Sequence, residues 1–301
     1  MRAIGPRLKM DISLALGGGG SKGNAHIGVL RRLEQHGLRV RAVAGTSFGA
    51  MVAVFYALGH SPDEIENLFA DFDQTKLYGH APEDGPSFMG IAGGAKWLEN
   101  SIGDKTFSDL KIPSILTAVD LKSAREVLLS EGPLLDAVLA SSAIPGIFPA
   151  RHIGEWELVD GGTLDPVPVA AARSLAQKLP VIAVALNTPI GEPAQTWNLP
   201  LPKYIPQSIT DRLSKMRYAV AVDIVLRSVD IMNRAVNEYR LEVDKPEIII
   251  RPRVSDIDTL QKVDVREIAE RGEQAFDEVL PELEKLFSWY QRLARAIKFW
   301  T

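Results

Sequence analysis

Short apolar runs alternate with helical patterns along the first part of the chain. Residues 11–16 and 40–44 are short, largely apolar runs, which are typical of buried strands. Residues 23–36 and 48–58 instead have the apolar spacing and length of helices. Strand, helix, strand and helix joined by short links predict parallel strands connected by right-handed crossovers. The pattern therefore favours an α/β fold.

The same reading extends over the rest of the sequence. Ser61 is expected to cap a third helix, since proline and two acidic residues follow it. Gly and Pro residues make 79–94 a predicted loop and a candidate lid, and four prolines make 191–206 a predicted linker. The remaining predicted elements are strands at 114–119, 126–129, 157–159, 181–186 and 247–250, and helices at 133–141, 167–175, 209–239 and from about 265.

Composition narrows the functional classes. The 301 residues suffice for one large domain or two modest ones, and 46% hydrophobic with 24% charged residues is typical of globular proteins. The formal net charge of -4 does not favour nucleic acid, and the absence of cysteine excludes disulfides and thiolate chemistry. No run is long and apolar enough for a membrane span. We expect a cytoplasmic protein.

A glycine cluster follows the first predicted strand and precedes the first helix. Residues 17–23 read GGGGSKG, and Gly18, Gly20 and Gly23 satisfy the dinucleotide-binding spacing. The acid that such a site needs about 20 residues later is missing, and Lys22 does not fit a phosphate-binding loop. Exposed amides beside a helix N-terminus also suit an oxyanion hole. The cluster alone leaves dinucleotide, oxyanion and plain-turn interpretations open.

A second motif lies where the second predicted strand becomes a helix. Residues 45–49 read GTSFG, and a strand-to-helix turn is the context that a nucleophilic serine elbow requires. Gly45 and Gly49 lack side chains that would collide across the turn, and the Phe48 amide could donate to an oxyanion. The alternative is that Thr46 or Ser47 only caps the helix.

A serine nucleophile needs a base, and Asp160 is the candidate. It follows an apolar strand and precedes Gly161 and Gly162, and strand ends are where open α/β sheets place their chemistry. A dry site would raise the proton affinity of the carboxylate. None of the five histidines lies in a triad-like motif, and His26 shares an apolar helical face. The alternative is that Asp160 merely forms a turn.

Taken together and in this order, GGGGSKG, GTSFG and DGG resemble the patatin-like phospholipase family. Further similar stretches are found at 26–37, 103–113, 140–149 and 160–173, so the resemblance covers about residues 11–190. It implies one domain over 1–301, a three-layer α/β/α sandwich with a mainly parallel sheet, and a helical portion over about 206–301. One departure is Asp165, where the family more often has asparagine; this aspartate is expected to cap the next helix.

The resemblance also implies a mechanism. Ser47 attacks an ester carbonyl and Asp160 takes its proton, while the amides of Gly18, Gly19 and Gly20, with Phe48, bind the oxyanion. Lys22 helps to fix the glycine loop or attracts anionic head groups, unless its side chain is simply solvated. The substrate would be a lipid or another acyl ester, and no cofactor or metal is expected.

The sequence also leaves open two alternative functions and a membrane contact. A dinucleotide-binding oxidoreductase would use the glycine loop but leaves GTSFG and DGG unexplained. A regulatory lipid-binding protein with a decayed site is the non-enzymatic alternative. The C-terminal segment has apolar residues at helical spacing, mixed with basic and aromatic ones, which suits either a docked helix or peripheral membrane contact. Its apolar positions are Leu283, Leu286, Phe287, Tyr290, Leu293 and Ile297.

Overall fold

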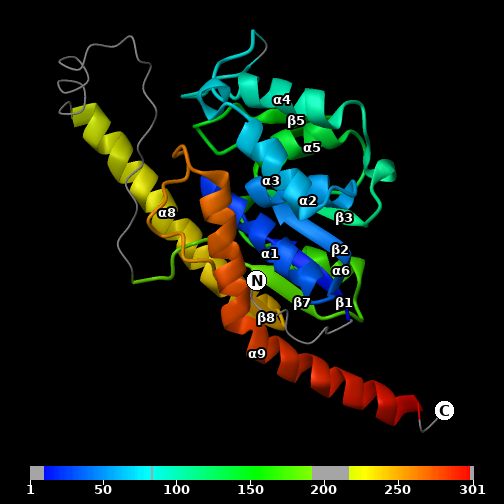
Figure 1. The fold of residues 1–301 in the computed structure, drawn as a ribbon. Coiled ribbons are helices and arrows are strands. Elements are labelled where there is room, and N and C mark those ends of the chain that lie inside the picture. The colour runs from blue at the N-terminus through cyan, green and yellow to red at the C-terminus, as the bar shows by residue number, and fades with distance from the viewer. Residues whose placement is uncertain (1–9, 83, 192–216, 299–301) are drawn as a thin grey trace.

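A mixed eight-stranded sheet forms the centre of the protein (Figure 1). The computed structural model describes residues 10–82, 84–191 and 217–298. The strands are β1 (Asp11–Leu16), β2 (Arg39–Thr46), β3 (Ser114–Asp120), β4 (Arg125–Leu129), β5 (Arg151–Ile153), β6 (Trp156–Asp160), β7 (Val181–Val184) and β8 (Ile248–Ile250). The hydrogen-bonded order is β5-β6-β3-β2-β1-β7-β8, with β4 also on β3.

The predicted parallel strands are confirmed in one half of the sheet. Strand β1 pairs in parallel with β2 and β7, and the outer pairs β2–β3 and β7–β8 are also parallel. Strands β4, β5 and β6 run antiparallel to their partners. The predicted α/β class is therefore correct, with an antiparallel addition at one edge.

Helices cover both faces of the sheet. The described helices are α1 (Ala25–Gln35), α2 (Phe48–Ala57), α3 (Pro62–Asp71), α4 (Ala92–Ile102), α5 (Leu134–Ser141), α6 (Val169–Leu175), α8 (Arg217–Asp244) and α9 (Val265–Lys298). Ile12, Leu14 and Leu16 of β1 join the large core under α1, α2 and α5, whereas Ala15 joins a smaller core beneath α6. The alternation of side chains along a strand thus builds a three-layer sandwich.

Helix α9 packs against α1 on the outside of this sandwich (Figure 1). The two backbones approach so closely that a Cβ at Gly28 would collide with the Ala269 carbonyl, and one at Gly272 with the Ala25 carbonyl. Phe276 and Leu283 of α9 are fully buried in the large core. A helix more than 200 residues after α1 in the sequence therefore completes the main core.

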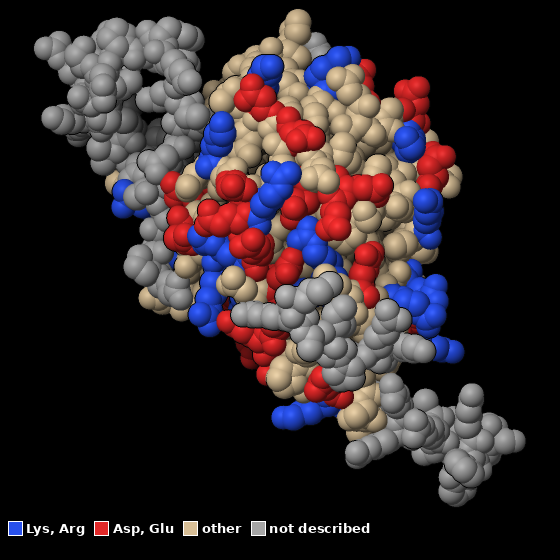
Figure 2. All heavy atoms as spheres, viewed as in Figure 1, with Lys and Arg blue, Asp and Glu red and all other residues tan. Residues whose placement is uncertain are grey.

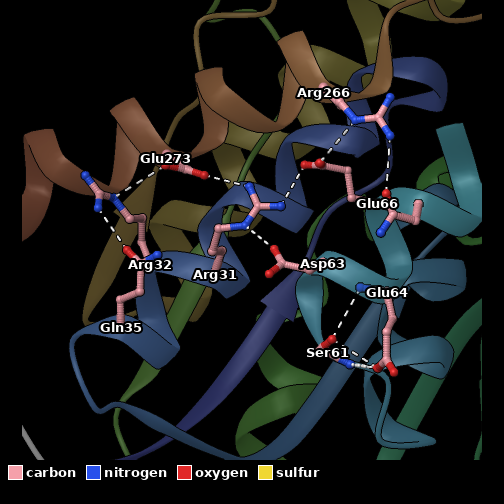
Figure 3. A network of polar contacts seen from close by, with 10 residues as sticks. Arg31, Arg32, Gln35, Ser61, Asp63, Glu64, Glu66, Arg266 and Glu273 are labelled. Atoms are coloured by element: carbon pink, nitrogen blue, oxygen red, sulfur yellow. Dashed lines mark hydrogen bonds and ion pairs between the residues drawn. The ribbon is translucent and has the colours of Figure 1, made fainter. Parts of the chain in front are cut away.

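Ion pairs tie this packing together (Figure 3). The Arg31 guanidinium donates to Asp63 and Glu66 of α3 and to Glu273 of α9, with N–O distances of 2.6–2.7 Å. Ser61 caps α3 in a reciprocal arrangement with Glu64, which confirms the predicted cap. On the face shown in Figure 2, basic and acidic side chains intermingle over these helices.

Several predicted boundaries move by a few residues. Strand β2 continues to Thr46 because that residue still pairs with Thr117 of β3. The first helix begins at Ala25, since 20–24 forms a 3-10 turn. From Val265 to Lys298 the chain is one helix that runs through Pro281, where several helices were predicted. Residues 192–206 of the predicted linker and 209–216 of the predicted long helix lie outside the described residues.

The segment predicted to dock on the domain or to contact a membrane forms the C-terminal end of α9. Leu283 and Phe287 are buried in the core, which is what a docked helix requires, whereas Trp289 is 55% exposed. The side chains from residue 290 onward lie outside the described residues. No helix in the described part of the chain has the length and apolarity needed to cross a membrane.

Candidate active site

Two strand ends meet on one edge of β3. Thr46, the last residue of β2, pairs with Thr117, and Asp160, the last residue of β6, pairs with Ala118. Strand β4 occupies the other edge of β3 at both positions. Strands β2 and β6 therefore share one edge and end at adjacent positions. This register places the residue after Thr46 beside Asp160, although 113 positions separate them in the sequence.

That next residue, Ser47, lies on a strained turn. Its φ of 56° and ψ of -126° are unusual for a residue other than glycine, as expected for a nucleophile elbow. A Cβ at Gly49 would collide with the Leu16 carbonyl, and one at Gly45 with the backbone of Ala50. The glycines of GTSFG are thus required by close backbone approach. The Ser47 amide donates to the Ser141 hydroxyl at 2.9 Å, which anchors the turn.

The glycine loop closes over this turn. An added Cβ at Gly18 would lie 3.2 Å from the Ser47 Cβ. The Gly18 amide already donates to the Pro166 carbonyl at 2.9 Å, so its predicted role as an oxyanion donor is wrong in this conformation. Gly19 and Gly20 line the pocket in front of Ser47. The Phe48 ring packs against Gly23, where a side chain would not fit.

His26 supports the glycine loop through a hydrogen bond to its first residue. It is fully buried and its Nε2 donates to the Gly17 carbonyl at 2.7 Å. Burial lowers the pKa of His26 to about 4, although this hydrogen bond acts in the opposite direction. Because its imidazole is neutral, buried and hydrogen-bonded, His26 is a packed structural residue, as the sequence predicted. His152, by contrast, is exposed on β5.

Asp160 is a buried carboxyl group with a raised proton affinity. Burial raises its pKa to about 6, opposed by hydrogen bonding with the Ser47 side chain and the Gly162 amide. The Gly162 amide donates to the carboxylate at 2.7 Å, and Gly161 packs so tightly on Thr117 that a side chain would not fit. These contacts fix the carboxylate beside Ser47.

A pocket of about 670 Å³, counting its open mouth, joins these parts. Ser47, Asp160 and the glycine loop line it together with residues that the sequence analysis missed, including Asp230, Asn233 and Arg234 of α8. Their i, i+3, i+4 spacing on one helical face was the available signal, but nothing in the sequence indicated which element this face covers. One wall of the pocket therefore comes from a distant helix.

Lys22 extends into the same pocket and is 4% exposed, so the solvated interpretation of its side chain is wrong. Burial lowers its pKa to about 8, whereas the charges of Asp230, Asp258 and Asp256 favour the ammonium form. Lys22 thus connects the glycine loop electrostatically to α8 and to the segment before α9. Among the described residues, no group of three or more His, Asp or Glu side chains is placed to hold a metal.

A second pocket of about 590 Å³ lies behind the elbow. Phe48 and Met51 of α2 line it with Phe69, Trp97 and other apolar side chains from α3 and α4. Ile91 from the predicted lid segment also lines it. That segment is held to the 144–148 turn by two backbone hydrogen bonds, from the Phe88 amide to Gly146 and from the Met89 amide to Ile147.

Asp165 has a different role from the predicted helix cap. The N-cap residue of α6 is Pro168, not Asp165. Asp165 is instead fully buried, and its carboxylate lies 2.8 Å from the Arg240 guanidinium of α8. Its carbonyl accepts a hydrogen bond from the Thr46 hydroxyl at 2.9 Å. The charge that distinguishes aspartate from asparagine is thus paired with a cation on the helix that walls the pocket.

Comparison with known proteins identifies a family whose sequence model matches the first part of the chain. The sequence model of the patatin-like phospholipase family matches residues 14–173, more than half of the chain. The chain belongs to this family. The match includes the patatin-like glycine loop, the GTSFG turn and Asp160, whereas α8 and α9 lie outside it.

Among its relatives, an uncharacterized NTE family protein of Mycobacterium tuberculosis is 35% identical over 187 residues, covering 61% of this chain and 51% of the relative. Patatin-like phospholipase domain-containing protein 6 of Mus musculus is 30% identical over 188 residues, covering 59% of this chain and 14% of that protein. The chain spans about half the length, or less, of these relatives.

The fold is also similar to a solved structure. VipD from Legionella pneumophila superposes with a TM-score of 0.55 at 16% identity, over 93% of this chain and 67% of VipD. At this identity the likeness concerns the fold alone. It extends beyond the family match and so includes the helical C-terminal portion.

Proposed function

We propose that this protein is a serine acyl hydrolase that cleaves fatty-acyl esters of lipids with Ser47 as nucleophile and Asp160 as base. The observation that carries the proposal is the meeting of β2 and β6 on β3, which puts a strained serine and a buried carboxylate in one pocket. Family membership supports a lipid ester as the substrate class.

In the proposed reaction, the Ser47 oxygen attacks the ester carbonyl while Asp160 accepts the hydroxyl proton. The resulting oxyanion is bound by backbone amides of Gly19, Gly20 and Phe48, and Gly18 supports the loop instead. The proton then passes from Asp160 to the leaving alcohol. Water, activated by the same carboxylate, hydrolyses the acyl-enzyme and releases a free fatty acid.

The surroundings suit this chemistry. The raised pKa of Asp160 makes it a stronger base than an ordinary carboxylate while leaving it ionised near neutral pH. The apolar pocket behind Phe48 offers space for hydrocarbon close to the elbow. The oxidoreductase alternative assigns no role to Ser47, and the regulatory alternative assigns none to the strain at this residue.

The first test is hydrolysis of p-nitrophenyl esters of increasing chain length by the parent and by Ser47→Ala and Asp160→Asn. We expect both variants to lose at least about a thousandfold in kcat, because nucleophile and base act as a unit. A fluorophosphonate probe should label the parent but not Ser47→Ala.

Two histidine variants are the matched controls. His152→Ala should retain parental hydrolysis, since the side chain is exposed on β5. His26→Asn can hydrogen-bond to the Gly17 carbonyl but cannot act as a base, so it should keep fluorophosphonate labelling. Near-parental hydrolysis by Asp160→Asn, or loss of labelling in either histidine variant, would overturn the assigned base. A parent that neither labels nor hydrolyses any ester would favour the regulatory alternative.

A further inference from the structure

The outer face of α8 carries an exposed apolar stripe. Six side chains on this helix are between 56% and 73% exposed: Ile224, Val225, Ile231, Met232, Tyr239 and Val243. They recur at intervals of seven and four residues, which places them along one side of the helix. Single exposed apolar residues are ordinary, but six on one side of a helix indicate a surface that contacts something apolar.

The opposite side of the same helix belongs to the active-site pocket. Asp230, Asn233 and Arg234 line it, and Arg240 anchors the helix through its ion pair with Asp165. Arg234 is 5% exposed and Asn237 is fully buried, so this side of α8 carries polar side chains together with the buried Leu241. An ordinary surface helix keeps its apolar side toward the core, whereas most of the described apolar side chains of α8 face solvent.

Other exposed apolar side chains lie beside the same pocket. Leu164 is 38% exposed and lies between the pocket residues Thr163 and Pro166. Phe88 is 54% exposed, and its amide binds Gly146, next to the pocket residue Pro145. Apolar surface thus occurs on α8 and on two other segments that adjoin the pocket.

We propose that the outer face of α8 is the surface by which this enzyme docks on a lipid interface. An amphipathic helix lying in an interface buries its apolar side among the lipids and places its polar side toward water. Docked in this way, α8 would bring the pocket on its polar side next to the lipids, so an ester could reach Ser47 over a short path. This inference rests on the proposed function, because a lipid-ester substrate is what makes a lipid interface the partner of this face.

Flotation with vesicles tests the docking directly. The protein is used in the Ser47→Ala background so that lipid is not consumed, with vesicles of phosphatidylcholine alone and of phosphatidylcholine mixed equally with phosphatidylglycerol. A stripe variant carries Val225→Gln, Met232→Gln and Tyr239→Gln. Because three apolar side chains lose their favourable transfer, we expect its vesicle affinity to fall at least about tenfold.

The matched control replaces three exposed apolar side chains elsewhere on the molecule. It carries Leu121→Gln, Leu128→Gln and Trp156→Gln, which are 44–52% exposed around the β3–β4–β6 edge and line neither pocket. This variant should float like its parent. Equal flotation of stripe and control variants, or no flotation of the parent protein, would overturn the proposal. So would a dimer, seen by light scattering, that only the stripe variant loses, because the occupant would then be a second copy.

Activity separates this proposal from the proposed function. With Ser47 restored, the stripe variant should hydrolyse vesicle lipid at least about tenfold more slowly than the parent, in step with its weaker binding. Its rate on water-soluble p-nitrophenyl butyrate should stay within about twofold, since no stripe side chain lines the pocket. A parent that floats but hydrolyses neither substrate would refute the hydrolase and leave the docking surface standing. A parent that hydrolyses butyrate without floating would support the hydrolase and refute the docking surface.

Discussion

Burial acts in opposite directions on the two titratable groups that support Ser47. It raises the pKa of Asp160 to about 6 and lowers that of His26 to about 4, because in each case the charged form loses hydration. Near neutral pH both groups are therefore in their basic forms. The carboxylate is ready to accept a proton, while the imidazole is neutral and donates to the Gly17 carbonyl.

The pH dependence of activity should follow Asp160. Below pH 6 the carboxyl group is increasingly protonated and cannot act as the base, so kcat/KM should fall about tenfold per unit of pH. Above pH 6 the acidic limb should level off. The measurement is kcat/KM on a short ester between pH 4 and pH 8, with the released acid quantified by chromatography because p-nitrophenol itself titrates in this range.

Stability has to be followed over the same range, because the two groups affect it with opposite signs. The raised pKa of Asp160 favours folding below its unfolded value of 3.8, and this contribution is lost as pH rises through 6. The lowered pKa of His26 favours folding above 6.5, and this contribution is lost as pH falls through 4. Circular dichroism at each pH separates unfolding from titration. A rate that stays flat to pH 4 in a folded protein would rule out Asp160 as the base.

At the scale of elements, the link between α8 and the strand ends depends on one ion pair between a buried carboxylate and a half-buried guanidinium. Asp165 is fully buried, and Arg240 is its cation, with Glu126 and Asp244 also near the guanidinium. Burial and the neighbouring Glu126 raise the pKa of Asp165 against the effect of Arg240. Because the Asp165 carbonyl also holds the Thr46 hydroxyl, this pair couples α8 to the residue before Ser47.

Removing only the cation should be costly. Arg240→Gln leaves a buried carboxylate without its partner, and we expect a loss of about 3 kcal/mol in the free energy of unfolding at pH 8. The loss should shrink toward pH 5, because protonation of Asp165 removes the uncompensated charge. Adding Asp165→Asn should recover most of the stability, since an amide can be buried at lower cost.

Urea unfolding of the two single variants and the double variant measures this coupling. Arg253→Gln is the control, because that arginine is 85% exposed and, in the described part of the chain, forms an ion pair only with the half-exposed Glu278. Its loss should stay below about 0.5 kcal/mol. Strictly additive effects of Asp165→Asn and Arg240→Gln would show that the pair does not couple α8 to the sheet.

At the scale of the whole molecule, local patterns predicted the elements but not their assembly. The GTSFG turn and the strand before Asp160 were recognisable because the turn chemistry and apolar run lie within a few residues of each site. The burial of Lys22 and the pairing of Asp165 could not be recognised, because both depend on α8, which begins more than 50 residues after either of them. The Gly18 amide was misassigned because its acceptor, the Pro166 carbonyl, also lies far from it in the sequence.

The C-terminal segment around Leu283 to Ile297 illustrates the same limit of local patterns. Its apolar spacing predicted a helix but could not distinguish a docked helix from a lipid-bound one. The structure settles this for Leu283 and Phe287, which are buried in the core. The exposed apolar face lies instead on α8, where apolar residues that face solvent produce the same periodicity as apolar residues that face a core.

The docking of α9 gives a prediction for the whole fold. Arg31 is 18% exposed and binds three carboxylates from α3 and α9, so Arg31→Met should remove several partly buried ion pairs at once. We expect a loss of about 2 kcal/mol in the free energy of unfolding at low salt, reduced at high salt by screening. Arg41→Met is the control, because Arg41 is half exposed and contacts only Asp11 among the ion pairs of the described chain, which predicts a loss below about 0.5 kcal/mol.

Hydrogen exchange resolves where the Arg31→Met loss acts. If the network holds α9 in place, amides of α9 and α1 should exchange faster in the variant while those of β1 and β2 stay protected, because local opening requires only that the helix detach. Uniform acceleration over the whole sheet would mean that α9 cannot detach without global unfolding. The helix beyond the family match would then be as much a part of the cooperative core as the strands that carry Ser47 and Asp160.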